Sequence, residues 1–305
     1  MVQQQLHYLQ PDVVSKLSNI ELLARLVVEG FITGLHKSPY HGFSVEFAEH
    51  RQYMPGDEIR RVDWRVYGKT DRFYVKQFEE ETNLKSYIVI DTSASMRFAS
   101  AMDKKGTKRI PKIAYASYIA ASLSYLMIQQ RDAVGLMLYD STVRTIIPPH
   151  ATKQHLRRVL IELEKIAPSQ STNSAAALHQ LAERISRRGL VVVLSDLFDD
   201  PAKVVAALKH FRHSHHEVLV MHVLDPMERT FAFGNDAIFK DIETGESLST
   251  QPYHVQRAYQ KTMNEFIELY KKECRENMID YVLLDTSTPF DVALLNYLNK
   301  RQRIR

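Results

Sequence analysis

The sequence has almost no cysteine and no long apolar run. Cys274 is the single cysteine among 305 residues, so no internal disulfide can form and the chain fits a reducing compartment. The most apolar stretch of helical period, residues 113–128, is interrupted by three serines and is too short to cross a bilayer. Residues 1–10 lack the charged start and apolar run of an export signal. We therefore expect no transmembrane segment and a cytoplasmic location.

An excess of charge of one sign is also missing. The 40 lysines and arginines nearly balance the 36 aspartates and glutamates, which leaves a net charge of +4. Basic and acidic residues are interspersed, so the sequence predicts no nucleic-acid partner. With 45% hydrophobic and 25% charged residues, the composition is that of an ordinary globular protein with one large or two modest domains.

Three common enzyme fingerprints do not occur in the sequence. There is no G-x-S-x-G nucleophile elbow, no P-loop and no G-x-G-x-x-G dinucleotide motif. These absences argue against a serine hydrolase and against the commonest nucleotide-binding enzymes. A phosphotransferase or hydrolase that uses Asp91 stays open as an alternative, although the second carboxylate such a mechanism wants two residues on is here Ser93.

From residue 87 onward, short apolar runs alternate with segments of helical period. The predicted strands are 87–90, 133–139, 143–147, 190–194, 217–223 and 281–284. The predicted helices are 108–130, 152–165, 175–187, 201–211, 253–277 and one that starts at Asp291. Continuous apolar strands that alternate with helices indicate an α/β fold with a mostly parallel sheet flanked by helices on both faces.

The residues before this pattern have a different character. Residues 12–28 have apolar positions at helical spacing, with Asp12 as a cap and Gly30 as a stop, which predicts an amphipathic helix. Residues 34–81 carry turn signals and short aromatic runs typical of irregular β structure and loops. We therefore divide the chain into an N-terminal helix and β/loop block, 1–84, and an α/β domain, 85–305.

Hydroxyl and carboxylate side chains follow the predicted strands where those strands end. Asp91, Ser93 and Ser95 come after one strand, and Asp196 comes after another. In open α/β sheets, ligands bind at the carboxyl ends of the strands, so these side chains are expected to meet. Oxygen ligands with few carboxylates suit Mg²⁺, with Mn²⁺ and Ca²⁺ as alternatives.

Asp91, Ser93 and Ser95 form a D-x-S-x-S string that resembles the metal-dependent adhesion site (MIDAS) of von Willebrand factor A domains. Thr172 and Asp196 stand in the places of the two other ligand residues. The resemblance implies that Ser93, Ser95 and Thr172 bind the metal directly and that both aspartates support it. It also implies that an aspartate or glutamate of a protein partner completes the metal shell.

The threonine segment departs from the usual pattern of that family. Thr172 is followed by Asn173, where glycine or aspartate is expected nearby. Ser171 and Ser174 are alternatives for the same ligand position. A turn with a helix cap, without metal, is the plainer interpretation of the whole site, and it would make the chain a metal-free structural scaffold.

A second resemblance covers the upstream block. The strings Ser38–Gly42, Glu46–Asp57 and Arg60–Trp64 are similar to the bacterial family called domain of unknown function 58. Members join such a block to a von Willebrand A-like domain and are often encoded beside MoxR-type AAA+ ATPases. The resemblance implies a metal-dependent protein-binding module that serves as adaptor or partner of such an ATPase in a chaperone-like or assembly role.

One polar and aromatic cluster in the upstream block has two interpretations. Its members are Asp57, Arg60, Arg61, Asp63 and Trp64. They either form a partner-binding surface or make an ion-paired network that packs the block against the sheet, with Trp64 as its anchor.

Overall fold

A six-stranded sheet forms the centre of the protein. The computed structural model describes residues 19–36, 50–53, 64–76, 84–100, 109–167, 174–233, 237–240 and 247–304. The strands of the sheet are β3 (Lys85–Asp91), β4 (Ala133–Tyr139), β5 (Val143–His150), β6 (Leu190–Ser195), β7 (Glu217–Leu224) and β10 (Asp280–Asp285). Their order is β10-β7-β6-β3-β4-β5, and every neighbouring pair is parallel except β4 and β5.

The central strands are apolar along their whole length because both faces of the sheet are covered. Every residue of β6 is buried, and β3 and β7 are buried after their first residue. A strand with one face in water would alternate apolar and polar residues, which these do not. The predicted α/β class with a mostly parallel sheet is confirmed, and each strand predicted from residue 87 onward is present.

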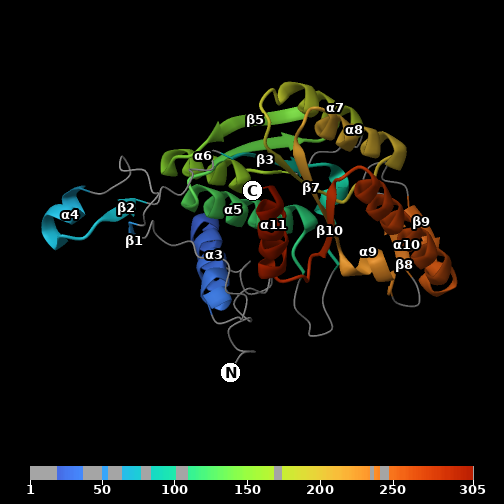
Figure 1. The fold of residues 1–305 in the computed structure, drawn as a ribbon. Coiled ribbons are helices and arrows are strands. Elements are labelled where there is room, and N and C mark those ends of the chain that lie inside the picture. Colours follow the sequence, from blue (N-terminus) through green and yellow to red (C-terminus); the bar gives the residue numbers. More distant parts are fainter. Residues whose placement is uncertain are drawn as a thin grey trace.

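Helices cover the two faces of the sheet (Figure 1). One layer consists of α3 (Ile20–His36), α5 (Lys112–Gln129), α6 (Lys153–Glu164) and α11 (Phe290–Ile304). The other consists of α7 (Ser174–Arg184), α8 (Pro201–His213) and α10 (Pro252–Glu276). Side chains alternate along β3, so that Ile88 and Ile90 pack under the first layer and Val89 under the second.

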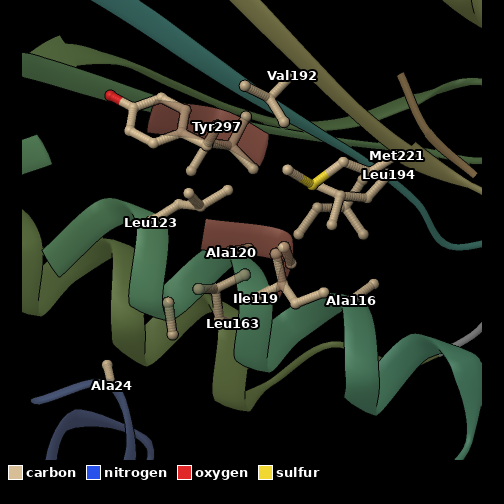
Figure 2. Packing of buried hydrophobic residues seen from close by; sticks show 14 of the residues in the cluster. Ala24, Ala116, Ile119, Ala120, Leu123, Leu163, Val192, Leu194, Met221 and Tyr297 are labelled. Carbon is tan, nitrogen blue, oxygen red and sulfur yellow. The ribbon is translucent and has the colours of Figure 1, made fainter. Parts of the chain in front are cut away.

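Helix α5 is enclosed by the sheet and by other helices. Figure 2 shows Ile119 and Leu123 on the side of α5 that faces Val192 and Leu194 of β6, with Ala24 of α3 beyond the helix. The serines of α5, which interrupt its apolar sequence, turn back onto the helix, since the Ser124 hydroxyl donates to the Ala120 carbonyl at 2.7 Å. Their polar groups are thereby satisfied inside the core. No helix among the described residues is both long and apolar enough to span a membrane.

The N-terminal helix extends further than its sequence predicts. Gly30 was expected to end it, but α3 continues through this glycine to His36. A glycine inside a helix costs only about 1 kcal/mol, and burial of Leu23, Val27 and Val28 against α5 offsets that cost. Residues 12–18 of the predicted helix lie outside the described residues. Because α3 shares its core with α5 and α11, the boundary at residue 84 stays a prediction.

Several short elements complete the described chain. They are β1 (His50–Gln52) paired with β2 (Tyr74–Lys76), α4 (Trp64–Thr70), the 3₁₀ turn η3 (Ala94–Arg97), α9 (Pro226–Thr230), and β8 (Ala237–Lys240) paired with β9 (Ser247–Thr250). The β1–β2 pair agrees with the irregular β structure expected upstream. The sequence pattern did not predict α4, α9, β8 or β9.

Candidate functional site

The chain reverses its direction of travel across the sheet between β3 and β6. From β3 it passes through α5 to β4 on one side, and it later returns to β6 on the other side of β3. The helices that leave two such strands lie on opposite faces, which opens a crevice outside their carboxyl ends. Asp91 is the last residue of β3, and Asp196 directly follows β6. Because β3 and β6 pair in parallel, their carboxyl ends lie side by side, and the metal site predicted there stays a prediction.

Asp91 is buried, with 2% of its surface exposed, and receives hydrogen bonds from neutral groups. Its Oδ1 accepts from the Ser93 amide at 2.9 Å, and its Oδ2 accepts from the Ser195 hydroxyl at 2.6 Å. Ser195 accepts in turn from the amide of Leu197 at 2.9 Å, which fixes its orientation. Burial, and after it the negative charge of Asp196, raise the pKa of Asp91 to about 6.

Ser93 and Ser95 bring two hydroxyl oxygens together beside Asp91. Ser93 precedes the 3₁₀ turn and Ser95 lies within it, so the tight turn places their Oγ atoms 3.1 Å apart. Ser93 is buried, whereas Ser95 is partly exposed and forms the open side of the pair. The loop is held to β4 by Thr92, whose amide and hydroxyl both donate to the Tyr139 carbonyl, at 2.7 and 2.8 Å.

Asp196 is neutralised by a lysine. Its Oδ2 lies 2.7 Å from Nζ of Lys112, and its Oδ1 accepts from the Phe198 amide at 3.2 Å. Lys112 is fully buried at the start of α5, and its Nζ also lies 2.6 Å from Oε1 of Glu228. Burial alone would lower the pKa of Lys112, but the charges of Asp196 and Glu228 outweigh it and raise the pKa. Lys112 is therefore a charged ammonium shared by two carboxylates.

A capped helix start presents Glu228 to this lysine. Asp225 follows β7 and caps α9, accepting from the Met227 amide at 2.8 Å, while Glu228 Oε2 accepts from the Asp225 amide at 2.8 Å. The other oxygen of Asp225 accepts from both the amide and the hydroxyl of Ser100 at 3.0 Å. Burial raises the pKa of Glu228 to about 6, although the positive charge of Lys112 opposes the shift. The loops after β3, β6 and β7 are thus joined by one polar network.

His222 supports the backbone under Asp196. Its Nε2 lies 2.8 Å from the Asp196 carbonyl oxygen, and its Nδ1 lies 2.6 Å from the Tyr281 hydroxyl. A carbonyl can only accept, so the ring proton is on Nε2 and Nδ1 accepts from the tyrosine. Burial lowers the pKa of His222 to about 4, which keeps the ring neutral.

The predicted site residues are only partly within the described chain. The structure brings Asp91, Ser93 and Ser95 together and places Asp196 at the next strand end, in the ion pair with Lys112. Thr172 and its alternative Ser171 lie outside the described residues, as does Asn173, and nothing is said of the Ser174 side chain. The five-residue ligand set therefore stays a prediction.

Of the predicted partner-binding cluster, only Trp64 is described. Asp57, Arg60, Arg61 and Asp63 lie outside the described residues. Trp64 is 57% exposed, so it is not a buried anchor. It forms an exposed aromatic group with Tyr67 and Phe73, whose ring centroids lie 6.0 and 6.4 Å from its own and 4.4 Å from each other.

Lys112 and Glu228 belong to the site but are not predicted from the sequence. A lysine at the start of a helix usually keeps its charged end in water, so nothing in its local pattern predicts burial. Glu228 had a usable signal, because Asp225-Pro226-Met227-Glu228 after an apolar strand is a capping box with proline at the first helical position. That signal predicts a helix start but not the lysine that the glutamate binds.

The oxygen groups beside Asp91 fit a small hard cation. Adjacent ligands of an octahedral Mg²⁺ at about 2.1 Å lie about 3 Å apart, and the two serine oxygens have this separation, 3.1 Å. Among the described residues, no three histidines, cysteines or acidic residues gather closely enough to bind a metal. A cation at this site would therefore depend on hydroxyl ligands, because Asp196 is already ion-paired with Lys112.

Fold and site together define an α/β protein with a buried polar cluster at the carboxyl ends of β3 and β6. The chain belongs to the family described as "Protein of unknown function DUF58", which it matches over residues 49–268. It is 28% identical over 243 residues to Uncharacterized protein Mb1516 of Mycobacterium bovis, which covers 77% of this chain and 72% of that protein. Uncharacterized protein Rv1480 of Mycobacterium tuberculosis matches to the same extent.

Two solved structures show a distant likeness. The conserved hypothetical protein BatB from Bacteroides thetaiotaomicron is 16% identical with a TM-score of 0.46, and the match covers 72% of this chain and 99% of that chain. The von Willebrand factor A (VWA) domain of SpRpn10 is 11% identical with a TM-score of 0.40, covering 71% and 95%. At this level of similarity neither structure bears on function.

Proposed function

We propose that this chain is a protein-binding module whose site at the ends of β3 and β6 uses a divalent cation, Mg²⁺, to recognise an acidic side chain of its partner. The observation that carries the proposal is the arrangement of Ser93 Oγ and Ser95 Oγ, 3.1 Å apart, beside the buried carboxylate of Asp91. Its position at the reversal point of the sheet is where proteins of this architecture bind ligands.

The electrostatics around Asp91 support a cation there. Its two oxygens accept from an amide and a hydroxyl, both neutral, and the nearby charge of Asp196 is negative. A buried carboxylate with such neighbours is stabilised by added positive charge. When bound, Mg²⁺ supplies a coordination position at which a partner carboxylate replaces a water.

The residues of this chain divide the work in the proposal. Ser93 and Ser95 hold the cation through their hydroxyls, and Asp91 provides the negative charge. Ser195 and the Ser93 amide keep the Asp91 carboxylate in place. Thr172 and Asp196 complete the set that the sequence resemblance implies. The rim at Ser95, which is partly exposed, is where a partner would approach.

The same geometry counts against the aspartyl-phosphate alternative. A nucleophilic carboxylate must present a free oxygen to its substrate. Asp91 is 2% exposed, and both of its oxygens already accept hydrogen bonds. The structure favours a binding role for Asp91 over a nucleophilic one.

Membership of the DUF58 family supports a MoxR-type AAA+ ATPase as the partner. The test is binding of the purified chain to an immobilised MoxR-type ATPase from the same organism, with Mg²⁺ and with a chelator. We expect binding to need Mg²⁺ and to be lost in Ser93→Ala, while Ser124→Ala, which removes a buried hydroxyl inside α5, binds as the unchanged chain does. Chelator-resistant binding that Ser93→Ala leaves intact would instead support the metal-free scaffold.

The exposed aromatic group of Trp64, Tyr67 and Phe73 is the second candidate contact for the ATPase. Tryptophan and tyrosine are enriched among the residues that dominate protein interfaces. A Trp64→Ala variant separates the two surfaces. If the ATPase docks here, the variant weakens binding equally in Mg²⁺ and in chelator, whereas docking on the rim at Ser95 leaves Trp64→Ala without effect.

A further inference from the structure

Lys112 places a fixed positive charge at the candidate metal site. Its Nζ lies 2.7 Å from Asp196 and 2.6 Å from Glu228, and the side chain has no exposed surface. The ring of Phe198, in the loop after β6, lies with its centroid 4.8 Å from the same nitrogen. A lysine buried to this degree is held by its ion pairs and is not free to leave for solvent.

The ammonium of Lys112 forms an ion pair with Asp196, a carboxylate that is expected to support the metal. The sequence resemblance gives Asp196 a supporting place around the metal, yet one of its oxygens binds Lys112 and the other accepts from the Phe198 amide. A divalent ion held by Asp91, Ser93 and Ser95 would feel the repulsion of the nearby ammonium, and that repulsion is strong where water is excluded. The ion pair with Lys112 therefore largely neutralises the charge of Asp196.

We propose that Lys112 acts as a permanent cation of this site. It holds Asp196 in an ion pair and thereby lowers the affinity of the site for a divalent ion. The inference rests on the proposed function. With Asp91 as the only carboxylate left for the metal among the described residues, the site lacks negative charge until a partner supplies an aspartate or glutamate. Metal and acidic partner then bind cooperatively, each raising the affinity for the other by the same factor.

The surrounding network holds the lysine in this position. Glu228 is fixed by the Asp225 amide, and Asp225 is fixed by Ser100. The amide of Lys112 itself donates to the Phe98 carbonyl at 3.1 Å, which ties the start of α5 to the segment after η3. Lys112 is therefore a positioning residue: it acts on the metal through Asp196 and through its charge.

The test is calorimetric titration of Mn²⁺ into the chelator-treated full chain, comparing the unchanged protein with Lys112→Met, Asp196→Asn and the double variant. Lys112→Met removes the ammonium at nearly constant volume and is expected to bind Mn²⁺ about tenfold more tightly or better. Asp196→Asn removes a negative charge and leaves the ammonium with Glu228 alone, so it is expected to bind Mn²⁺ more weakly than the unchanged chain. The gain of Lys112→Met should disappear in the double variant, because it depends on the freed Asp196 carboxylate.

The outcomes separate this inference from the proposed function. Equal Mn²⁺ affinity in the unchanged chain and in folded Lys112→Met would overturn the role of Lys112 and leave the metal site standing. Binding in Lys112→Met alone would support the role of Lys112 and overturn the metal dependence of the natural chain. Binding in the double variant as tight as in Lys112→Met would show that the gain does not depend on Asp196 and overturn the inference, and absence of binding in all four folded proteins would overturn both.

Lys112→Met leaves two carboxylates unpaired, so its folding needs a safeguard. The variant Lys112→Met/Glu228→Gln removes one of those negative charges and retains Asp196, and it is expected to show the same gain in Mn²⁺ affinity. Far-ultraviolet circular dichroism and thermal unfolding of each variant establish that it is folded before the titration is interpreted.

Discussion

An aspartate stands at the carboxyl end of each of two neighbouring strands, β3 and β6, and the two carboxylates have different hydrogen-bond partners. Asp91 accepts hydrogen bonds from an amide and a hydroxyl, both neutral, whereas Asp196 forms an ion pair with the ammonium of Lys112. The difference follows from the layers of the fold. Asp91 lies on the same face of β3 as Val89, toward the layer of α7 and α8, while Lys112 reaches Asp196 from α5 in the opposite layer. One strand end thus has a positively charged partner within the chain, and we propose that the other binds a divalent cation.

The largest expected effect comes from removing the ammonium of Lys112. Lys112→Ala should lower the free energy of unfolding by about 3–5 kcal/mol, because it leaves buried carboxylates without a partner. The matched control is Lys209→Ala, whose ion pair with Glu273 at 3.2 Å is partly exposed and should be worth less than about 1 kcal/mol. Urea unfolding monitored by circular dichroism measures both, and equal losses would contradict the central place given to Lys112.

Exchanging each aspartate for asparagine tests the comparison directly. Asp196→Asn should cost about 2–4 kcal/mol of unfolding free energy, because it weakens the hold on a buried ammonium. Asp91→Asn should change stability by no more than about 1 kcal/mol, because its donors are neutral and the Ser195 hydroxyl can turn to accept from the new amide. Urea unfolding in chelator separates them, and a larger loss in Asp91→Asn would reverse the account.

The support beneath Asp196 predicts a pH dependence. The pKa of His222 is lowered to about 4 by burial, below the unfolded value of about 6.5. The neutral ring therefore contributes stability that is fully present above pH 6.5 and is lost as the pH falls toward 4. Between pH 7 and pH 5 the contribution of His222 should fall by about 2 kcal/mol, while the raised pKa values of Asp91 and Glu228 act in the opposite direction in this window.

A His222→Gln variant should remove most of that pH dependence. The exposed His254 offers the control, since His254→Gln should leave the slope of stability against pH as it is in the unchanged chain. Thermal unfolding at several pH values between 7 and 5 measures the slopes. Equal slopes of stability against pH in His222→Gln and in the unchanged chain would mean that the neutral buried ring of His222 is not the source of the pH dependence.

A smaller effect than that of Lys112→Ala or Asp196→Asn is expected from the hydrogen bond that Ser195 donates to Asp91. Ser195→Ala removes the 2.6 Å hydrogen bond to Asp91 and should cost about 1–2 kcal/mol. Ser117→Ala is the control, because that hydroxyl bonds only back to its own helix, at the Ile113 carbonyl, and its removal should be nearly neutral. Chemical unfolding in chelator compares the two, and no loss in Ser195→Ala would mean that this bond does not hold Asp91.

The sequence predicted the strand ends well and the ion pair not at all. Strands buried on both faces have continuous apolar runs, so the positions of Asp91 and Asp196 follow from pattern alone. The partners of Lys112, Asp196 and Glu228, lie 84 and 116 positions further along the chain, and no local periodicity encodes such a contact. Gly30 failed as a stop because tertiary packing on α5 outweighs a helix propensity of about 1 kcal/mol.

The central claim is that Asp91, Ser93 and Ser95 bind a divalent cation. Calorimetric titration of Mg²⁺ and Mn²⁺ into the chelator-treated chain tests it most directly, with Asp91→Asn and Ser93→Ala as variants and Ser124→Ala as control. The account predicts saturable binding to a single site in the unchanged chain and in Ser124→Ala, lost in the other two. Absence of binding by the folded chain, or equal binding by Asp91→Asn and Ser93→Ala, would contradict it.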